Sequence, residues 1–305
     1  MSTPGRPARG KPFRRRRLVA LAVAIAVLAA LGWGVSRIAA GADNTTADHR
    51  SDRAPNRTST VPRKPLVLRI LFPEGFTRRQ MAERIGAVNV IARAKRHTGT
   101  RLSPPAYLRI TAHSRFPRRF PGAGRTRSLE GFLFPALYDF TPTTSTRRLV
   151  NEQLVAFREN WRKVNLRHAR SKNLTPYDVL IIASMIEKEV RAPAERRLVA
   201  AVIYNRLHRH MQLGIDSTIR YGLHIPPTRS LTTAELHSPN PYNTRVHYGL
   251  PPTPIANPGL ASIQAAAHPA HRPYLYFVRK PDKIHHFFTA SYRAFVRYER
   301  AHGYG

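Results

Sequence analysis

An uncharged run of 18 residues near the N-terminus places the strongest constraint on this chain. Residues 18–35 carry no charged side chain and directly follow four arginines, Arg14–Arg17. As a helix, this run would be about 27 Å long, close to the hydrocarbon thickness of about 30 Å in a bilayer. We therefore expect a single transmembrane helix over residues 18–36. Because basic flanks stay on the cytoplasmic side, residues 1–17 are expected to be a cytoplasmic tail, with the rest of the chain outside the cell.

A cleaved signal peptide is the alternative interpretation of the same run. The small residues Ala40-Gly41-Ala42 match the composition of a cleavage site. The apolar stretch, however, is longer than the core of about 7–15 residues that is usual in a signal peptide. We therefore favour a permanent single-pass anchor in the plasma membrane.

The chain is also strongly basic. It contains 51 Lys and Arg residues against 17 Asp and Glu residues, a formal net charge of +34. Such a charge attracts polyanions at long range, among them nucleic acids, anionic lipids and anionic wall polymers. The basic residues are spread along the chain, and no helix-turn-helix, zinc-finger or RNA-recognition pattern accompanies them. Nucleic acid is therefore not expected as a partner.

The sequence gives no sign of a metal or a cofactor. It contains no cysteine, which excludes disulfides and thiolate metal sites. His285 and His286 are adjacent, but no cluster of acidic residues accompanies them. We therefore expect a protein without a metal or a cofactor.

Three segments are expected beyond the membrane. Residues 37–64 are polar and lack periodic apolar positions, so they predict a flexible linker. Residues 65–120 begin with a β-rich run that ends at the turn Pro73-Glu74-Gly75, and a capping box of Thr77 and Gln80 then starts a helix. This pattern predicts a small α+β module. Residues 121–305 would form the main domain, so the fold class is α+β.

The best-specified helix of the main domain begins after residue 174. Thr175 is a suitable N-cap, Pro176 suits the first helical position, and Asp178 offsets the positive helix end. Residues 179–186 are too short a run to span a membrane and too apolar for a surface helix. We therefore predict a helix that is buried on most sides.

A carboxylate, Glu187, follows directly on this apolar run. An apolar wall disfavours the charged form of a carboxyl group, and the raised pKa that results suits a general acid. Glu189 is no dyad partner, because positions i and i+2 lie about 200° apart around a helix. The residues alone leave a second role open, in which Glu187 caps the neighbouring helix or forms a structural salt bridge with it, through Arg196 or Arg197.

The segment that contains Glu187 resembles a signature of a known family. Residues 182–189 (IASMIEKE) resemble the ASIIEKE signature of the YceG-like family, the endolytic murein transglycosylases. Further blocks follow in family order: LEGFLFP at 129–135 with Tyr138, VIYNRL at 202–207, MQLGIDST at 211–218, PYNT at 241–244, GLPPTPI at 249–255, NPG at 257–259, PYLYFV at 273–278 and HHFF at 285–288. The ordered set covers roughly residues 65–300, which makes the match specific.

The resemblance implies a fold and a reaction. Residues 65–120 would be a LysM-like module and residues 121–305 the catalytic domain, whose buried helix carries the catalytic Glu187. The implied reaction cleaves the β-1,4 bond between N-acetylmuramic acid and N-acetylglucosamine in peptidoglycan glycan strands. The muramic acid 6-hydroxyl attacks its own anomeric carbon and leaves a 1,6-anhydro end, so no water is added. One carboxyl group can serve both steps, unlike the two carboxylates of most glycosidases.

Other site residues follow from the same resemblance. Substrate-binding candidates are Glu189 as a supporting residue, Glu130 within the cleft, and Asn205, Asp216, Tyr242 and Asn243 along the groove. For all of these except Glu189, packing or turn structure is an equally open role. The segment Asn257-Pro258-Gly259 is expected to fix loop geometry. Gly214, Ile215 and Ser217 depart from the family pattern, so the loop that carries Asp216 is expected to differ in shape.

The resemblance also suggests partners. Penicillin-binding synthases would be neighbours, and the enzyme would help to end the growth of nascent strands. Two other functions stay open: a non-catalytic peptidoglycan-binding or divisome scaffold, and a membrane protein that binds polyanions.

Overall fold

The computed structural model describes residues 65–112, 120–123 and 128–304. The chain divides into two units, residues 1–61 and 62–305, and the description below concerns the second. The predicted cytoplasmic tail, transmembrane helix and linker lie outside the described residues. Among the helices of the described segments, none combines the length and the apolar character needed to cross a bilayer.

A small antiparallel sheet joins β1 (Leu68–Leu71) to β2 (Leu137–Phe140). Ile70 lies opposite Tyr138, and both are buried, whereas Leu71 and Leu137 on the other face are exposed. The alternation therefore buries one face of the sheet. The predicted boundary at residue 120 falls between the two strands of this sheet.

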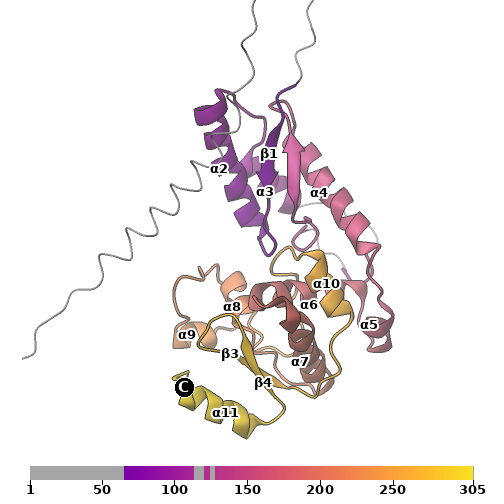
Figure 1. Ribbon diagram of the computed structural model, residues 1–305, viewed down its shortest axis with the longest axis vertical. Coiled ribbons are helices and arrows are strands. Elements are labelled where there is room, and N and C mark those ends of the chain that lie inside the picture. The colour runs from indigo at the N-terminus through magenta and orange to yellow at the C-terminus, as the bar shows by residue number, and fades with distance from the viewer. Residues whose placement is uncertain (1–64, 113–119, 124–127, 305) are drawn as a thin grey trace, which may run out of the picture. The chain divides into compact units, whose positions relative to one another are not determined.

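Helices cover the buried face of this sheet (Figure 1). They are α2 (Arg78–Arg96), α3 (Pro104–Ala112) and α4 (Thr146–Trp161). At the start of α2, Thr77 Oγ1 accepts a hydrogen bond from Gln80 N, and Gln80 Oε1 accepts one from Thr77 N. The predicted capping box is confirmed, and it fixes the point at which the chain turns from β1 into α2.

The helix α6 (Pro176–Glu189) forms the centre of the larger helical part. Every residue from Val179 to Ile186 is buried, as predicted. Thr175 Oγ1 accepts a hydrogen bond from Asp178 N, and an Asp178 carboxylate oxygen accepts one from Thr175 N, so the start of the helix is also confirmed. The neighbours that bury α6 are α7 (Arg196–His208), α8 (Asp216–Gly222) and α10 (Leu260–Ala267).

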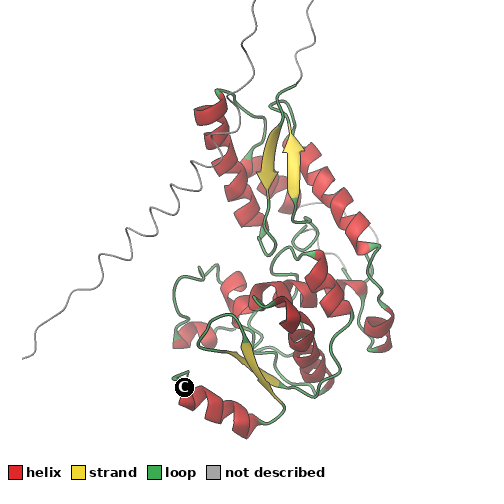
Figure 2. Cartoon of the chain, viewed as in Figure 1, coloured by secondary structure: helices red, strands yellow, loops and turns green. Residues whose placement is uncertain are grey.

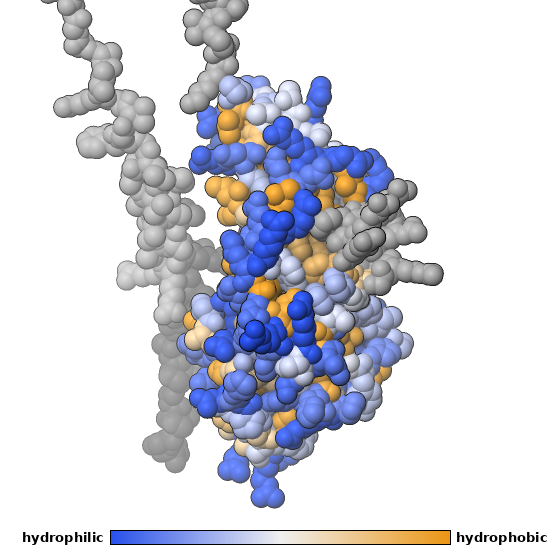
Figure 3. All heavy atoms as spheres, turned by 90° about the vertical axis from the view of Figure 1, so that its right-hand side faces the viewer, coloured by the Kyte–Doolittle hydropathy of each residue, from blue (hydrophilic) through white to orange (hydrophobic). Residues whose placement is uncertain are grey.

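The remaining described elements are short or lie at the periphery. They are α5 (Arg167–Ser171), the 3-10 helix η1 (Pro193–Glu195), α9 (Thr233–Leu236), the hairpin of β3 (Tyr276–Arg279) and β4 (His286–Thr289), and α11 (Tyr292–Ala301). Helices dominate, accompanied by two separate two-stranded sheets (Figure 2). The described part of the chain is therefore α+β, as predicted. The face shown in Figure 3 is largely hydrophilic, with smaller apolar areas between the polar side chains.

Candidate active site

The C-terminal end of α6 presents Glu187 at the edge of the core. The residue is half-buried, directly after the apolar run of the helix. Its Oε2 accepts a hydrogen bond of 3.0 Å from the backbone N–H of Gly259. Gly259 is the N-cap of α10, so this N–H belongs to the positive end of a helix. The bond fixes the orientation of the carboxyl group.

A salt bridge does not account for Glu187. Arg196 donates to Ser262 Oγ, and Arg197 donates to the carbonyl oxygen of His268. Within the described residues, neither arginine forms an ion pair with Glu187. Both arginines therefore bond to other groups, and the salt-bridge role of Glu187 is not found.

A second carboxylate, Glu74, approaches the same place from the turn between β1 and α2. Its side chain lies against the Cα of Gly259, where a Cβ atom would overlap the Glu74 carboxylate. Burial raises the pKa of Glu74, the negative charge of Glu187 raises it further, and Arg196 lowers it. The two carboxyl groups therefore meet at Gly259 and influence each other electrostatically.

Backbone hydrogen bonds hold the Glu74 turn against the site. Gly75 N donates to Asn257 O at 2.9 Å, and Asn257 N donates to Phe76 O at 3.0 Å. Lys188 Nζ donates to Gly75 O at 3.3 Å. Gly75 has a φ of +75°, which favours glycine, and a Cβ atom there would lie 3.4 Å from the Cγ of Glu187. The turn is thus fastened to both sides of the acid.

Glu130 is the buried acid of the site. It accepts hydrogen bonds from Arg78 N at 3.0 Å, Asn257 Nδ2 at 2.8 Å and the Tyr221 hydroxyl at 3.1 Å. Burial raises the pKa of Glu130 to about 7, against the lowering effect of Arg78. The predicted cleft residue therefore joins the start of α2 to Asn257 and to Tyr221 on α8.

Tyr242 is connected to this network through another tyrosine. Its ring contacts that of Tyr221 at a centroid distance of 5.0 Å, and its hydroxyl is 2.9 Å from Thr253 Oγ1. Tyr221 in turn donates to Glu130. The structure therefore brings Tyr242 and Glu130 together, and Asn257 links Glu130 to the Glu74 turn.

Two other predicted substrate-binding residues, Asn243 and Asp216, bond to groups outside this network. Asn243 is fully buried; its Nδ2 donates to Leu236 O and Ser238 O, and its Oδ1 accepts from Arg245 N. These bonds stabilise its own loop. Asp216 is partly exposed and forms an ion pair with Arg245 at 2.8 Å.

Glu189 is half-buried and ends α6. Its charge acts on the intervening Lys188: burial lowers the pKa of Lys188, and Glu189, Glu130 and Glu187 raise it. The supporting residue of the prediction is therefore an electrostatic neighbour of the site. Its role in substrate binding stays a prediction.

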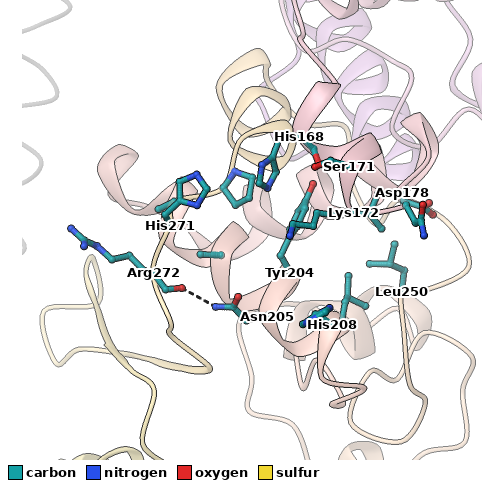
Figure 4. Close-up of a pocket in the computed structure, with 16 residues that line it drawn as sticks. His168, Ser171, Lys172, Asp178, Tyr204, Asn205, His208, Leu250, His271 and Arg272 are labelled. Carbon is teal, nitrogen blue, oxygen red and sulfur yellow. Dashed lines mark hydrogen bonds between the residues drawn. The ribbon is translucent and has the colours of Figure 1, made fainter.

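Asn205 lies in a different place. Its Nδ2 donates to Arg272 O and Tyr274 O at 2.8 Å each, in a cavity of about 920 Å³ (Figure 4). The cavity also contains Asp178, at the start of α6. Asp178 and Glu187 are nine residues apart, which is about 14 Å along a helix axis. Asn205 therefore lies near the start of α6, whereas Glu187 lies at the end of that helix.

The lining of this cavity includes the basic side chains of Lys172 and Arg272, three histidines and Tyr204, among small, apolar and neutral polar residues. The rings of His168 and His271 are 5.7 Å apart, and Tyr204 lies 5.8 Å from His168. Burial lowers the pKa of His168, as do the neighbouring His271, Lys172 and His268. Across the described residues, no group of three or more potential metal ligands is found, here or elsewhere.

Sequence reasoning missed Glu74, Lys188 and the backbone of Gly259. The triplet at Glu74 indicated only a turn, and Lys188 only a neighbour of Glu187. Glu74 and Gly259 meet Glu187 through contacts between distant parts of the chain, which leave no local pattern. The sequence marks Glu74 only by its place before Gly75 in a turn. That place predicts backbone geometry and does not predict a carboxylate at the site.

Comparisons with known proteins give a consistent result. The sequence model of the YceG-like family matches residues 21–301. The endolytic murein transglycosylase of Streptococcus pneumoniae (strain ATCC BAA-255 / R6) is 33% identical over 233 residues, which cover 71% of this chain and 41% of that protein. The endolytic murein transglycosylase of Bacillus subtilis (strain 168) is 37% identical over 158 residues, which cover 50% of this chain and 42% of that protein. The chain thus spans about two fifths of the length of these curated relatives.

A solved structure shares the fold. The crystal structure of a YceG-like protein from Listeria monocytogenes superimposes with a TM-score of 0.63 and 28% sequence identity. The match covers 75% of each chain.

Proposed function

Because this chain belongs to the YceG-like family, we propose that it is a lytic transglycosylase that cleaves peptidoglycan glycan strands, with Glu187 as its acid. One observation carries the proposal. Glu187 stands at the end of a buried helix, is held in position by the N–H of Gly259, and has no ion-pair partner within the described segments. The relatives named endolytic murein transglycosylases support the substrate and the reaction class.

The geometry suits a single group that first donates and then accepts a proton. Gly259 holds Oε2, and no hydrogen bond to Oε1 is found among the described residues. Oε1 can therefore protonate the glycosidic oxygen as the bond to the anomeric carbon breaks. The muramic acid 6-hydroxyl then bonds to that carbon and returns its proton to the Glu187 carboxylate. Atoms and charge balance without water, and the product is a 1,6-anhydro end.

We also place the enzyme at the outer face of the plasma membrane. The support is the sequence: the basic tail at residues 1–17 and the uncharged run that follows it. A single-pass anchor there would keep the active site beside strands as penicillin-binding synthases make them. In this position, cleavage would end the elongation of nascent strands.

The direct test is the replacement Glu187→Gln in the full-length protein, assayed on purified glycan strands. We expect the rate of formation of anhydro ends, followed by mass spectrometry, to fall by at least about 100-fold, which is the usual contribution of a general acid. Glu83→Gln is the control, because it removes an exposed acid on α2 to which no role in the site is assigned. Wild-type rates from Glu187→Gln would exclude Glu187 as the acid. Binding of strands without any cleavage by the wild-type protein would instead favour the peptidoglycan-binding scaffold.

A further inference from the structure

We propose that the cavity shown in Figure 4 is an oxyanion-binding site, whose ligand is the terminal phosphate group of a larger molecule. The cavity lies near the start of α6, whereas Glu187 lies at the end of that helix. The site is therefore separate from the one assigned to strand cleavage, and its binding can be measured without that activity.

Histidines gather at this cavity. His168, His208 and His271 line it, and His268 is close enough to lower the pKa of His168. Four of the 14 histidines of the chain therefore lie in or beside one cavity. No group of three or more potential metal ligands is found among the described residues, so these rings do not form a metal site. A protonated imidazole donates hydrogen bonds from both ring nitrogens, which suits an anion.

The basic groups that face the cavity lack partners. Lys172 lines it and forms no ion pair among the described residues. The rings of His168 and His271 are 5.7 Å apart, and their nitrogens form no hydrogen bond within the described segments. Arg272 also borders the cavity, but its guanidinium group points away from the other labelled side chains (Figure 4). Donors are thus available from the end of α5 and from the loop that follows α10.

These groups also repel one another when charged. Burial lowers the pKa of His168, and basic neighbours lower it further: His271, Lys172 and His268. Asp178, at the start of α6, is the one acid among the described residues that line the cavity. Its carboxylate already accepts two hydrogen bonds from the N-cap residue of α6. A bound anion would therefore relieve a repulsion that the acidic side chain of the cavity does not offset.

The walls of the cavity are held without these basic side chains. Residues 268–272 are bonded to α7, where Ala270 N donates to Arg197 O at 2.9 Å. Asn205 Nδ2 donates to Arg272 O at 2.8 Å. At the other wall, backbone hydrogen bonds close the end of α5. The cavity is thus preformed, as ligand sites usually are, and replacement of one basic side chain should leave its shape intact.

Size and charge favour a terminal phosphate group. The volume of about 920 Å³ is near the upper end of the range of about 300–1,000 Å³ that is typical of ligand sites, so a lone ion would leave most of it unfilled. The basic groups approach from α5, α7 and the loop after α10. A terminal phosphate presents three oxygens and a charge of about −1.5 to −2, so it can face all three segments at once. A carboxylate has fewer oxygens and less charge, and it would offset less of the repulsion.

The test is isothermal titration calorimetry of the full-length protein with glucose 6-phosphate, inorganic phosphate and acetate. We expect glucose 6-phosphate to bind most tightly and acetate least tightly. Lys172→Gln should weaken the binding of glucose 6-phosphate by about tenfold or more, because it removes a charge-assisted hydrogen bond. Lys95→Gln, which removes an exposed lysine from α2, is the matched control and should leave the affinity unchanged. An unchanged unfolding midpoint shows that each variant is folded.

Several results would overturn the site. Equal losses from Lys172→Gln and Lys95→Gln, or no binding of either phosphate by the wild-type protein, would leave only diffuse attraction to a basic surface. Tighter binding of acetate would replace the phosphate with a carboxylate, such as that of a peptide. Tighter binding of inorganic phosphate would exclude the larger ligand.

Sulfate provides an independent measurement, because its charge stays constant across the pH range in which histidine titrates. The affinity for sulfate should fall as the pH rises through this range, and His168→Gln should reduce the slope. Tyr204, which contacts His168 from α7, does not titrate there, because burial raises its pKa. His302→Gln, which removes an exposed histidine after α11, is the control and should keep the wild-type slope. A flat profile in the wild-type protein, or an equal change of slope in both variants, would overturn the part of the histidines in the site.

Discussion

Asn257 and Glu130 lie 127 residues apart in the sequence, yet the side-chain amide of Asn257 donates a hydrogen bond of 2.8 Å to Glu130 Oε1. The same amide donates to Phe76 O at 2.9 Å. Its Oδ1 accepts from Gly131 N at 2.9 Å and from Leu133 N at 3.0 Å. A single buried side chain therefore joins three segments: its own, the start of α2 at Phe76, and residues 130–133.

Replacement of Asn257 should for this reason be costly. Asn257→Ala leaves the buried N–H groups of Gly131 and Leu133 without their acceptor, and Phe76 O and Glu130 each lose one of their donors. We therefore expect the free energy of unfolding to fall by about 3–5 kcal/mol. Urea denaturation followed by circular dichroism measures the change. Asn165→Ala is the control: Asn165 is exposed and accepts one hydrogen bond from Arg167 N, so the loss should stay below about 1 kcal/mol. A similar loss from both variants would contradict the role of Asn257 as a junction.

Glu130 should make the stability of the protein depend on pH. Burial raises the pKa of Glu130 from 4.5 to about 7 in the folded state, so the folded state binds this proton more tightly than the unfolded state does. Its contribution is fully present below pH 4.5 and is lost as the pH rises toward 7. The free energy of unfolding of the wild-type protein, relative to Glu130→Gln, should therefore fall by about 3 kcal/mol over this range.

The pH slope, rather than the absolute stability, is the informative quantity for Glu130→Gln. The amide loses an acceptor toward Arg78 N, Asn257 Nδ2 and the Tyr221 hydroxyl, and this cost is the same at every pH. Denaturation curves of both proteins at several pH values between 4.5 and 7 separate the two effects. Parallel pH profiles would show that Glu130 titrates as an ordinary surface acid.

The sequence predicted those parts of the fold whose signals are local. The Thr175 cap and the run from Val179 to Ile186 specify α6 completely, because an N-cap, a first-turn acid and continuous apolar character act within one helix. The family blocks placed Glu187 correctly at the end of that helix. Asn257 was expected to fix loop geometry, and it does, but its partners at Phe76, Glu130 and Gly131 could not be read from its neighbours.

The composition of the site was harder to predict. Glu74 belongs to the turn between β1 and α2, and only the tertiary contact at Gly259 shows its relation to Glu187. Asn205 lies in a sequence block that matches the family pattern closely. Its side-chain amide nevertheless bonds to Arg272 O and Tyr274 O and does not reach Glu187. A match between sequences gives the order of residues along the chain. Membership of the site depends instead on where each side chain lies in the folded structure.

The core around α6 should tolerate little change in volume. Leu180 is fully buried, and its side chain also lies beside Gly131, where a Cβ would come within 3.2 Å of it. Leu180→Ala should lower the free energy of unfolding by about 3 kcal/mol, since it removes buried methyl groups and leaves a cavity. Val155→Ala on α4 is the control, because Val155 is 42% exposed and its loss should cost less than about 1 kcal/mol. Equal changes in the denaturation midpoint would argue against the buried position of α6.

Replacement of Asn205 tests whether this residue lines the substrate groove or only stabilises the fold. Its amide holds the carbonyl oxygens of Arg272 and Tyr274, so Asn205→Ala should lower the free energy of unfolding by about 1–2 kcal/mol. Because Asn205 lies near the start of α6 and Glu187 at the end of that helix, we expect kcat/KM for strand cleavage to stay close to the wild-type value. The informative comparison is with Tyr242→Phe, which removes a hydroxyl from the network that reaches Glu130. A large rise in KM with Asn205→Ala, at unchanged stability, would place the glycan strand along the cavity of His168 and His271 instead of across the end of α6 that carries Glu187.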